Sequence, residues 1–85
     1  MAKKGPSVQE AREALMAEGR PLDDGGLLDA ARRGDAASLE LYLAAGFSPR
    51  RAVLTTGRSP LVEAARSGSD EAVDLLLSAG EDPAE

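Results

Sequence analysis

The sequence of 85 residues contains no cysteine and no histidine. These absences exclude disulfide bridges, thiolate and imidazole metal ligands, and a histidine general base. Isoleucine and tryptophan are also missing, and Tyr42 and Phe47 are the only aromatic residues. The β-branched and aromatic residues that favour strands are therefore scarce, and the core has to be stabilised by the packing of aliphatic side chains alone.

The sequence also lacks long apolar runs and an excess of positive charge. No stretch approaches the roughly 18 consecutive apolar residues of a membrane span, and no apolar segment follows the N-terminal lysines as in a signal peptide. The net charge of -5 argues against non-specific binding to nucleic acid or anionic membranes, which depends on an excess of Lys and Arg. We therefore expect a cytoplasmic protein with no nucleic-acid or membrane partner.

The residues that are abundant favour helices. The chain holds 12 Leu and 16 Ala, which rank at the top of the helix propensity scale, so we expect one all-α domain over residues 1–85. No phosphate-binding loop or nucleophile elbow occurs. Asp23 to Gly26, read as DDGG, can be drawn as a carboxylate pair or metal site, but this composition is more typical of a turn into a helix. We predict no catalytic residue, metal or cofactor, and hence no enzyme.

A shift of 34 residues aligns the chain with itself. It places Leu27 to Pro49 over Leu61 to Pro83, and ten of the 23 aligned positions are identical. Gly34 pairs with Gly68 and Gly46 with Gly80, at positions where a helix would have to end. The sequence therefore contains an internal repeat.

Each copy of the repeat is predicted to form two short helices. In the second copy, Ser59 is placed to cap the first helix, and Pro60 occupies the first helical position, where its missing N–H costs nothing. Gly68 supplies a left-handed stop. Ser69 or Asp70 then caps the next helix.

Apolar stripes along these helices indicate which sides are buried. The expected stripes are Leu61, Ala64 and Ala65 on the first helix, and Val73, Leu76 and Leu77, with Leu75 lying off the stripe, on the second. The paired alanines would let neighbouring helices approach closely. The second helix is expected to be buried between neighbours, and Gly80 to end it.

This pattern resembles the ankyrin repeat. The second unit matches the family pattern at Gly57, Ser59 to Leu61, Ala64, Ala65, Gly68, Val73, Leu75 to Leu77, Gly80 and Asp82. The resemblance implies an ankyrin-like stack of helix-turn-helix repeats, with a first repeat over residues 26–58 and a second over residues 59–85. The start of the first repeat is expected to be weaker, because Gly25 and Gly26 stand where Ser59 and Pro60 stand in the second.

The N-terminal segment is interpreted as a half-repeat that caps the stack over residues 7–19. Ser7 and Glu10 have the spacing of a capping box, and Gly19 supplies a stop. Aligning the glycines places Ala14-Leu15-Met16 over residues 41–43 and 75–77, with Val8, Ala11 and Leu15 on one face. The alternative is a loose amphipathic helix.

In the family, partners bind at the hairpin-like finger and the exposed side of each first helix. The resemblance implies a finger over Ser48 to Arg58, with a bulge or a looser tip because the spacing from Gly46 to Gly57 is one residue longer than usual. Phe47 and Leu54 are expected to tuck under this finger. The alternative is that they join Val53 as apolar anchors on the binding surface.

Six arginines lie on these segments, and we call them the arginine patch: Arg32, Arg33, Arg50, Arg51, Arg58 and Arg66. With Glu63 they form the predicted partner-binding set. In one interpretation these arginines only keep the surface soluble or pair with nearby acids. In the other they dock an acidic partner, because the guanidinium group grips carboxylates in pairs.

Two functions therefore remain open. The first is a non-catalytic module that binds an unidentified partner protein, as a small inhibitor or protective partner, and the richness in Ala, Gly and Arg favours a bacterial origin. The second is a structural unit that self-associates, or stacks on further repeats, through the helix at residues 75–77, which no following unit covers.

Overall fold

The structure, a computed structural model, describes residues 7–79. In this part of the chain it contains helices and no strand, which confirms the predicted all-α fold. The helices are α1 (Val8–Ala17), α2 (Asp24–Arg33), α3 (Ala36–Ala44), α4 (Pro49–Thr56), α5 (Pro60–Ser67) and α6 (Asp70–Ser78). None of the helices in the described range has the length and apolar character needed to cross a bilayer.

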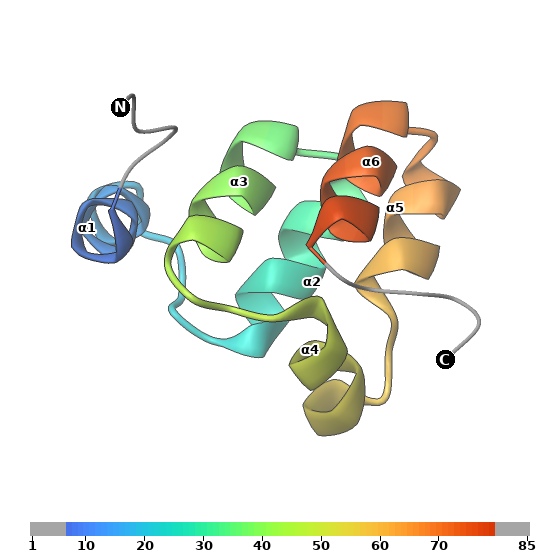
Figure 1. Cartoon of the computed structure of the whole chain (residues 1–85), viewed down its shortest axis with the longest axis horizontal. Helices are drawn as coiled ribbons and strands as arrows, with labels where there is room; N and C mark the ends of the chain where they lie inside the picture. Colours follow the sequence, from blue (N-terminus) through green and yellow to red (C-terminus); the bar gives the residue numbers. More distant parts are fainter. Residues whose placement is uncertain (1–6, 80–85) are drawn as a thin grey trace.

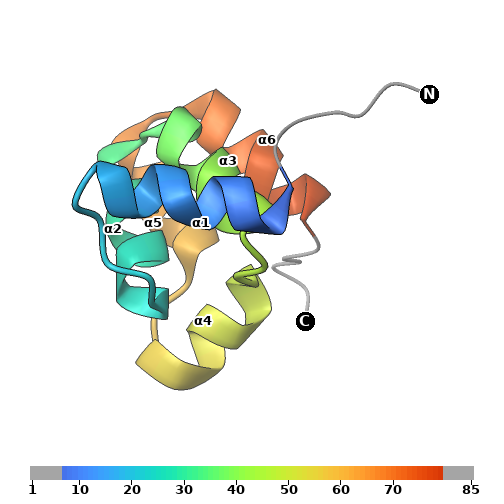
Figure 2. The ribbon, with the colours of Figure 1, turned by 90° about the vertical axis from the view of Figure 1, so that its left-hand side faces the viewer.

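Two helix pairs lie side by side. The first pair is α2 and α3 and the second is α5 and α6, with α2 against α5 and α3 against α6 (Figure 1). Helix α1 packs on α3 at the front of the stack, as the view from that side shows (Figure 2). One layer therefore consists of α2 and α5, and the other of α1, α3 and α6, as the predicted stack requires.

The buried residues confirm the alignment of the three triplets at residues 14–16, 41–43 and 75–77. Leu15, Tyr42 and Leu76 stand in the middle of these triplets, and each is fully buried. They join a continuous core that runs through both helix pairs, with Ala11, Leu27, Ala30, Ala31, Leu39, Ala45, Ala52, Ala64 and Ala72 as its other members. Alanine dominates this core, so the helices can approach closely.

The predicted helix starts and stops around the second unit are confirmed. The Ser59 hydroxyl accepts from the N–H of Val62, Pro60 follows at the first helical position, and Gly68 ends α5 with φ of 79°. Ser69, rather than Asp70, caps α6. Gly80, the expected end of α6, lies outside the described residues.

The starts of α1 and α2 also follow the sequence signals. Ser7 and Glu10 form the expected capping box. Asp23 caps α2, and its carboxylate accepts from the N–H of Gly26 at 2.8 Å, so the DDGG stretch is a turn into a helix as predicted. Helix α2 begins at Asp24, two residues ahead of Gly26, the position that aligns with Pro60.

The predicted hairpin-like finger with a bulge is wrong, because the segment forms helix α4. Ser48 caps this helix, Pro49 occupies its first position, and Gly57 ends it with φ of 76°. This is the same Ser-Pro start and glycine stop that delimit α5. Between these signals the residues RRAVLTT include no glycine, asparagine or aspartate to turn the chain, so the local sequence favours helix over hairpin.

The predicted stripes of the second unit need correction. Ala31 is fully buried beneath α5, but its counterpart Ala65 is exposed, because no described helix covers that side of α5. On α6 the residues fully buried in the core are Ala72 and Leu76, whereas Leu77 is 46% exposed. Val8 in α1 is likewise exposed rather than packed on the stack.

Candidate functional site

Helix α4 projects from one edge of the stack, below α2 and α5 in both ribbon views (Figures 1 and 2). It contacts both α2 and α5, and its residues Pro49 and Ala52 are buried. Two contacts tie it to the start of α2: the Thr55 hydroxyl donates to the Asp24 carboxylate at 2.6 Å, and the Arg51 guanidinium lies 3.7 Å from the same group. The helix is therefore held in a defined orientation.

The two apolar residues expected to tuck under the finger behave differently. Phe47 does pack inward, since it is half-buried against the core and its ring meets that of Tyr42 edge-on, with centroids 5.4 Å apart. Leu54 does not, because its residue surface is 84% exposed on α4. That part of the expectation is wrong, and the alternative of an apolar anchor on the surface stays open for Leu54.

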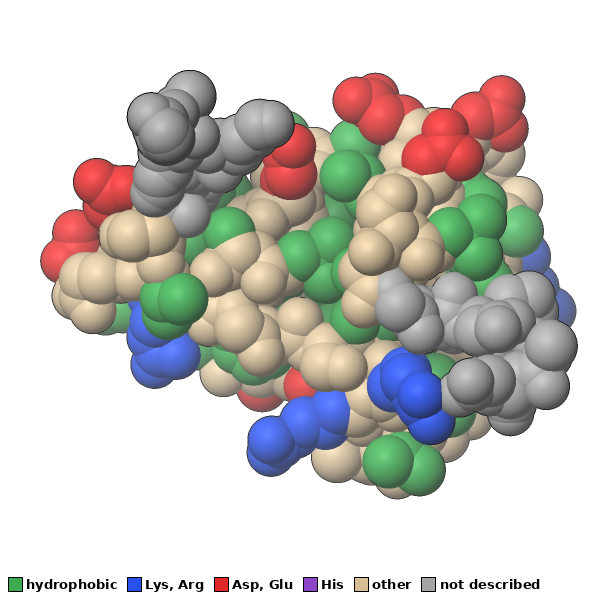
Figure 3. All heavy atoms as spheres, in the orientation of Figure 1, with side chains coloured by type: hydrophobic (Ala, Val, Ile, Leu, Met, Phe, Trp, Pro, Cys, Tyr) green, Lys and Arg blue, Asp and Glu red, His purple; other side chains and the backbone are tan. Residues whose placement is uncertain are grey.

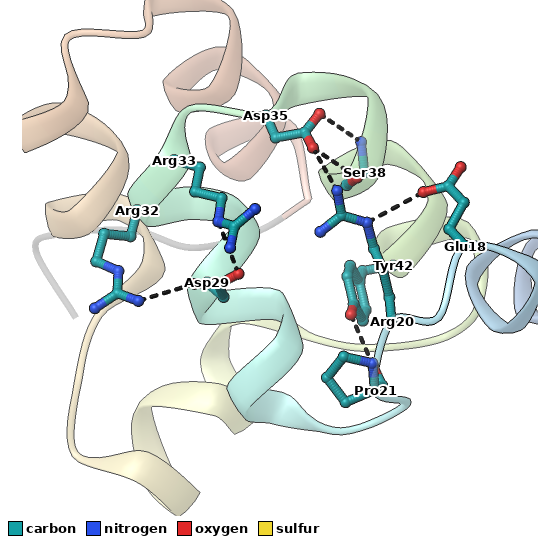
Figure 4. A network of polar contacts seen from close by, with 9 residues as sticks. All are labelled: Glu18, Arg20, Pro21, Asp29, Arg32, Arg33, Asp35, Ser38 and Tyr42. Atoms are coloured by element: carbon teal, nitrogen blue, oxygen red, sulfur yellow. Dashed lines mark hydrogen bonds and ion pairs between the residues drawn. The ribbon is translucent and has the colours of Figure 1, made fainter.

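Several arginines of the patch pair with acids of the same chain. Asp29 accepts from Arg32 at 2.8 Å and lies 3.1 Å from the Nε of Arg33 (Figure 4). Arg58 lies 3.6 Å from Glu63. These arginines thus pair with nearby acids, as the first interpretation expects. The pairing does not bury the arginine side chains.

The acids are the covered member of each pair. The side chains of Asp24, Asp29 and Glu63 are 15%, 30% and 11% exposed, respectively. Their arginine partners are 62–74% exposed. A protein that approaches this surface meets guanidinium groups before it meets carboxylates.

The structure brings together three of the seven predicted partner-binding residues in one surface pocket. Arg32, Arg58 and Glu63 share a pocket of about 230 Å³ with Gly25, Leu28 and Asp29. Arg51 instead lines a pocket of about 390 Å³ on the other side of α4's start, with Arg12, Leu22, Asp23, Asp24, Ala45, Gly46 and Phe47. Arg33, Arg50 and Arg66 are exposed and line neither pocket.

Charge is unevenly distributed over the molecule. Helices α2, α4 and α5, with residues 57–59 between them, hold six arginines and three acids, a net charge of +3. Because the whole chain carries -5, the remaining residues carry -8. Acidic side chains gather over α3 and α6 and at the α1 end, and Lys and Arg side chains lie around α4, with others at the α1 end and at the right-hand edge (Figure 3).

A separate polar network connects α1 to α3. The Arg20 guanidinium donates to Glu18 at 3.1 Å and to Asp35 at 3.0 Å (Figure 4). The Ser38 hydroxyl donates to Asp35 at 2.8 Å, and this bond, opposed by partial burial, lowers the pKa of the Asp35 carboxyl below its ordinary value. The nearby Tyr42 hydroxyl donates to the Pro21 carbonyl at 2.7 Å. This network stabilises the stack, and of the arginine patch Arg33 also acts on it, through its charge near Asp35.

Two residues that shape the candidate site were not in the predicted set. Asp29 stands three and four residues before Arg32 and Arg33, and this spacing is a usable sequence signal for helical ion pairs. Asp24 holds α4 through Thr55 and Arg51. No sequence signal identifies this role, because Asp24 and Thr55 are 31 residues apart and α4 itself was expected to be a hairpin.

The comparisons with known proteins agree with this architecture. Residues 56–85 match the family model described as Ankyrin repeat, and comparison with curated proteins and with solved structures gave no match. Ankyrin repeats are generally non-catalytic protein–protein interaction modules. Within residues 7–79 no group of three or more potential metal ligands occurs. The chain, with its two stacked helix pairs, therefore carries an ankyrin repeat over residues 56–85.

Proposed function

We propose that this protein is a small cytoplasmic module that binds an acidic partner protein through the arginine patch and Glu63, and that it inhibits or protects that partner. The observation that carries the proposal is the distribution of charge: a net charge of +3 on α2, α4, α5 and residues 57–59 within a chain of -5. Complementary charge of this kind steers association and selects partners.

The internal ion pairs do not prevent this function. The arginines of these pairs are 62–74% exposed and each guanidinium has five N–H donors, so a partner's carboxylate binds them without displacing the internal acid. Arg58 and Arg32 reach the same pocket from different helices, which lets one acidic segment contact both. Arginine suits this role because its planar fork binds a carboxylate through two hydrogen bonds.

Within this module we propose the division of labour that the repeat suggests. Residues 7–19 cap the stack, residues 26–58 form the first unit, which includes α4, and residues 59–85 form the second unit. The contact of α1 with α3 supports the cap.

The test is a pull-down from the source cell with mass spectrometry, which compares the wild type with the double variant Arg50→Glu, Arg51→Glu. We expect the double variant to lose the partner that the wild type retains. Its melting transition should stay nearly unchanged, because Arg50 and Arg51 are exposed and the Arg51–Asp24 contact is long, at 3.7 Å.

A charge-matched control separates a local effect from a change of net charge. Lys3→Glu with Lys4→Glu changes the net charge by the same amount at the N-terminus. This control should retain the partner. Equal capture by the wild type and the Arg50, Arg51 variant would contradict the arginine patch as the binding surface.

A second candidate function rests on a different observation. Val62, Ala65 and Leu77 of the second unit are exposed, although Ala31, the counterpart of Ala65, is covered by α5 in the first unit. An apolar surface of this kind supports self-association, or stacking on further repeats. Light scattering at tens of micromolar protein distinguishes the two functions, because a monomer that unfolds cooperatively excludes self-association.

A further inference from the structure

We infer that α4 is the anchor of the interaction: Leu54 packs against apolar residues of an acidic segment of the partner, and Arg50 and Arg51 bind carboxylates of the same segment. This inference rests on the proposed function and specifies the partner's chemistry. The inference concerns helix α4, which takes the place of the expected hairpin finger. The arrangement of its side chains is therefore a feature of this chain that the resemblance does not predict.

The exposure of Leu54 is the first argument. At 84% it is the most exposed of the large apolar residues in the described range, ahead of Met16 at 60% and Val8 at 54%. A single exposed leucine is common on protein surfaces and needs no explanation by itself. The position of Leu54 between charged groups is what makes it informative.

The spacing on the helix is the second argument. Leu54 follows Arg50 by four residues and Arg51 by three, and residues at these separations are neighbours on one side of a helix. One side of α4 therefore presents an apolar side chain beside two guanidinium groups. The matching partner segment carries apolar residues beside carboxylates, because α4 presents Leu54 next to two arginines and contains no acid of its own.

The rigidity of α4 is the third argument. Ser48 and Gly57 define both helix ends, Pro49 and Ala52 are buried beneath it, and Thr55 ties it to Asp24. A surface already ordered in the free protein loses little conformational entropy on binding. Docked anchors of this kind dominate the affinity of protein interfaces.

The experiment uses the full chain and a phage-displayed library of random peptides as the probe. We expect the selected peptides to combine apolar with acidic residues. Leu54→Ala should lower their affinity about tenfold, the size of a moderate interface anchor. Met16→Ala is the matched control, because Met16 is also exposed, at 60%, but lies on α1, and it should leave the affinity unchanged.

Three results would overturn the inference. The first is a selection that enriches no acidic peptide, and the second is a set of peptides whose affinity is insensitive to Leu54→Ala. In that second case, a loss of affinity in the variant Arg32→Glu with Arg58→Glu would overturn the role of α4 but leave the proposed function intact. The third is a wild-type dimer that Leu54→Ala dissociates, which would make a second copy the occupant. Circular dichroism of each variant verifies that the helices are retained.

Discussion

Tyr42 shows how a single residue fixes the contact between helices. Its ring is fully buried, and its hydroxyl donates to the carbonyl of Pro21 at 2.7 Å, so the segment that follows α1 is attached to α3. Burial raises the pKa of this hydroxyl, which keeps it protonated as a donor. Gly26 leaves the space that the phenol occupies, because a Cβ on it would contact the Tyr42 hydroxyl and lie 2.7 Å from the Pro21 carbonyl oxygen.

At this scale we predict that Gly26→Ala destabilises the protein by about 2 kcal/mol, as overpacking in a closed site typically does. The neighbouring variant Gly25→Ala is the control. A Cβ there meets only the Asp23 side chain, at 3.4 Å, and alanine is the better helix former, so its stability should equal or exceed that of the wild type. Urea unfolding measures both, and equal loss in the two variants would contradict the role given to Tyr42.

At the scale of elements, α1 and α4 are the helices that a minimal pair of repeats does not require. Helix α1 buries Ala11 and Leu15 against the stack and leaves Met16 exposed. Helix α4 buries Pro49 and Ala52 and leaves Leu54 exposed. Both helices therefore combine a stabilising side with a free side, but only α4 carries arginine without acid.

Leu15→Ala tests whether α1 stabilises the stack. Truncation of a fully buried leucine costs about 3 kcal/mol, through lost burial and the cavity that remains. Met16→Ala removes a side chain of similar size one position further on, where 60% is exposed, and should cost less than about 0.5 kcal/mol. A Leu15→Ala variant as stable in urea as Met16→Ala would show that α1 is a loose helix.

Gly68→Val tests the turn between α5 and α6. Gly68 has φ of 79°, a conformation that strains a β-branched residue, although a Cβ there would meet nothing within 4 Å. The cost is therefore conformational and should reach about 1–3 kcal/mol, concentrated in the second helix pair. Amide hydrogen exchange should show α5 and α6 opening more readily than α2 and α3. Unchanged exchange in α5 and α6 would refute this role of Gly68.

At the scale of the whole molecule, the layer of α2 and α5 is neutral, the layer of α1, α3 and α6 is acidic, and the positive charge lies on α4 and Arg58. Arginines lie on α2, α4 and α5, whereas α3 and α6 contain acids and no base. Where acid and base meet inside the fold, as at Asp35 and Arg20, the contact joins α1 to the start of α3. The stability of the stack should therefore depend on pH.

We predict that stability falls as the pH drops below about 4. The hydrogen bond from Ser38, with help from Arg20, depresses the folded-state pKa of Asp35 below its unfolded value of about 3.9. The stabilisation is therefore complete above that unfolded pKa and is lost as the pH falls through the folded pKa. Asp35→Asn should be less stable than the wild type at pH 7 and show a smaller loss on acidification, which urea midpoints between pH 7 and pH 2 would measure. An identical pH profile in the variant would exclude Asp35 as the responsible group.

The sequence by itself determined the helical class, the repeat, and most helix ends. These features depend on local signals: Ser59, Pro60 and Gly68 act within one turn of the chain, and the alignment of Leu15, Tyr42 and Leu76 follows from glycine spacing. The same local signals at Ser48, Pro49 and Gly57 also indicate α4, and the hairpin was expected only because the resemblance outweighed them.

Only the tertiary structure decided which faces are covered and which charges meet. Ala31 and Ala65 occupy equivalent positions, yet one is buried and the other exposed, because burial depends on the neighbouring helix and not on the residue. The Thr55–Asp24 contact joins residues far apart in the chain. The exposure of Leu54 follows from the way α4 packs on α2 and α5. Periodicity specifies a helix face, but the packing of separate helices determines what that face meets.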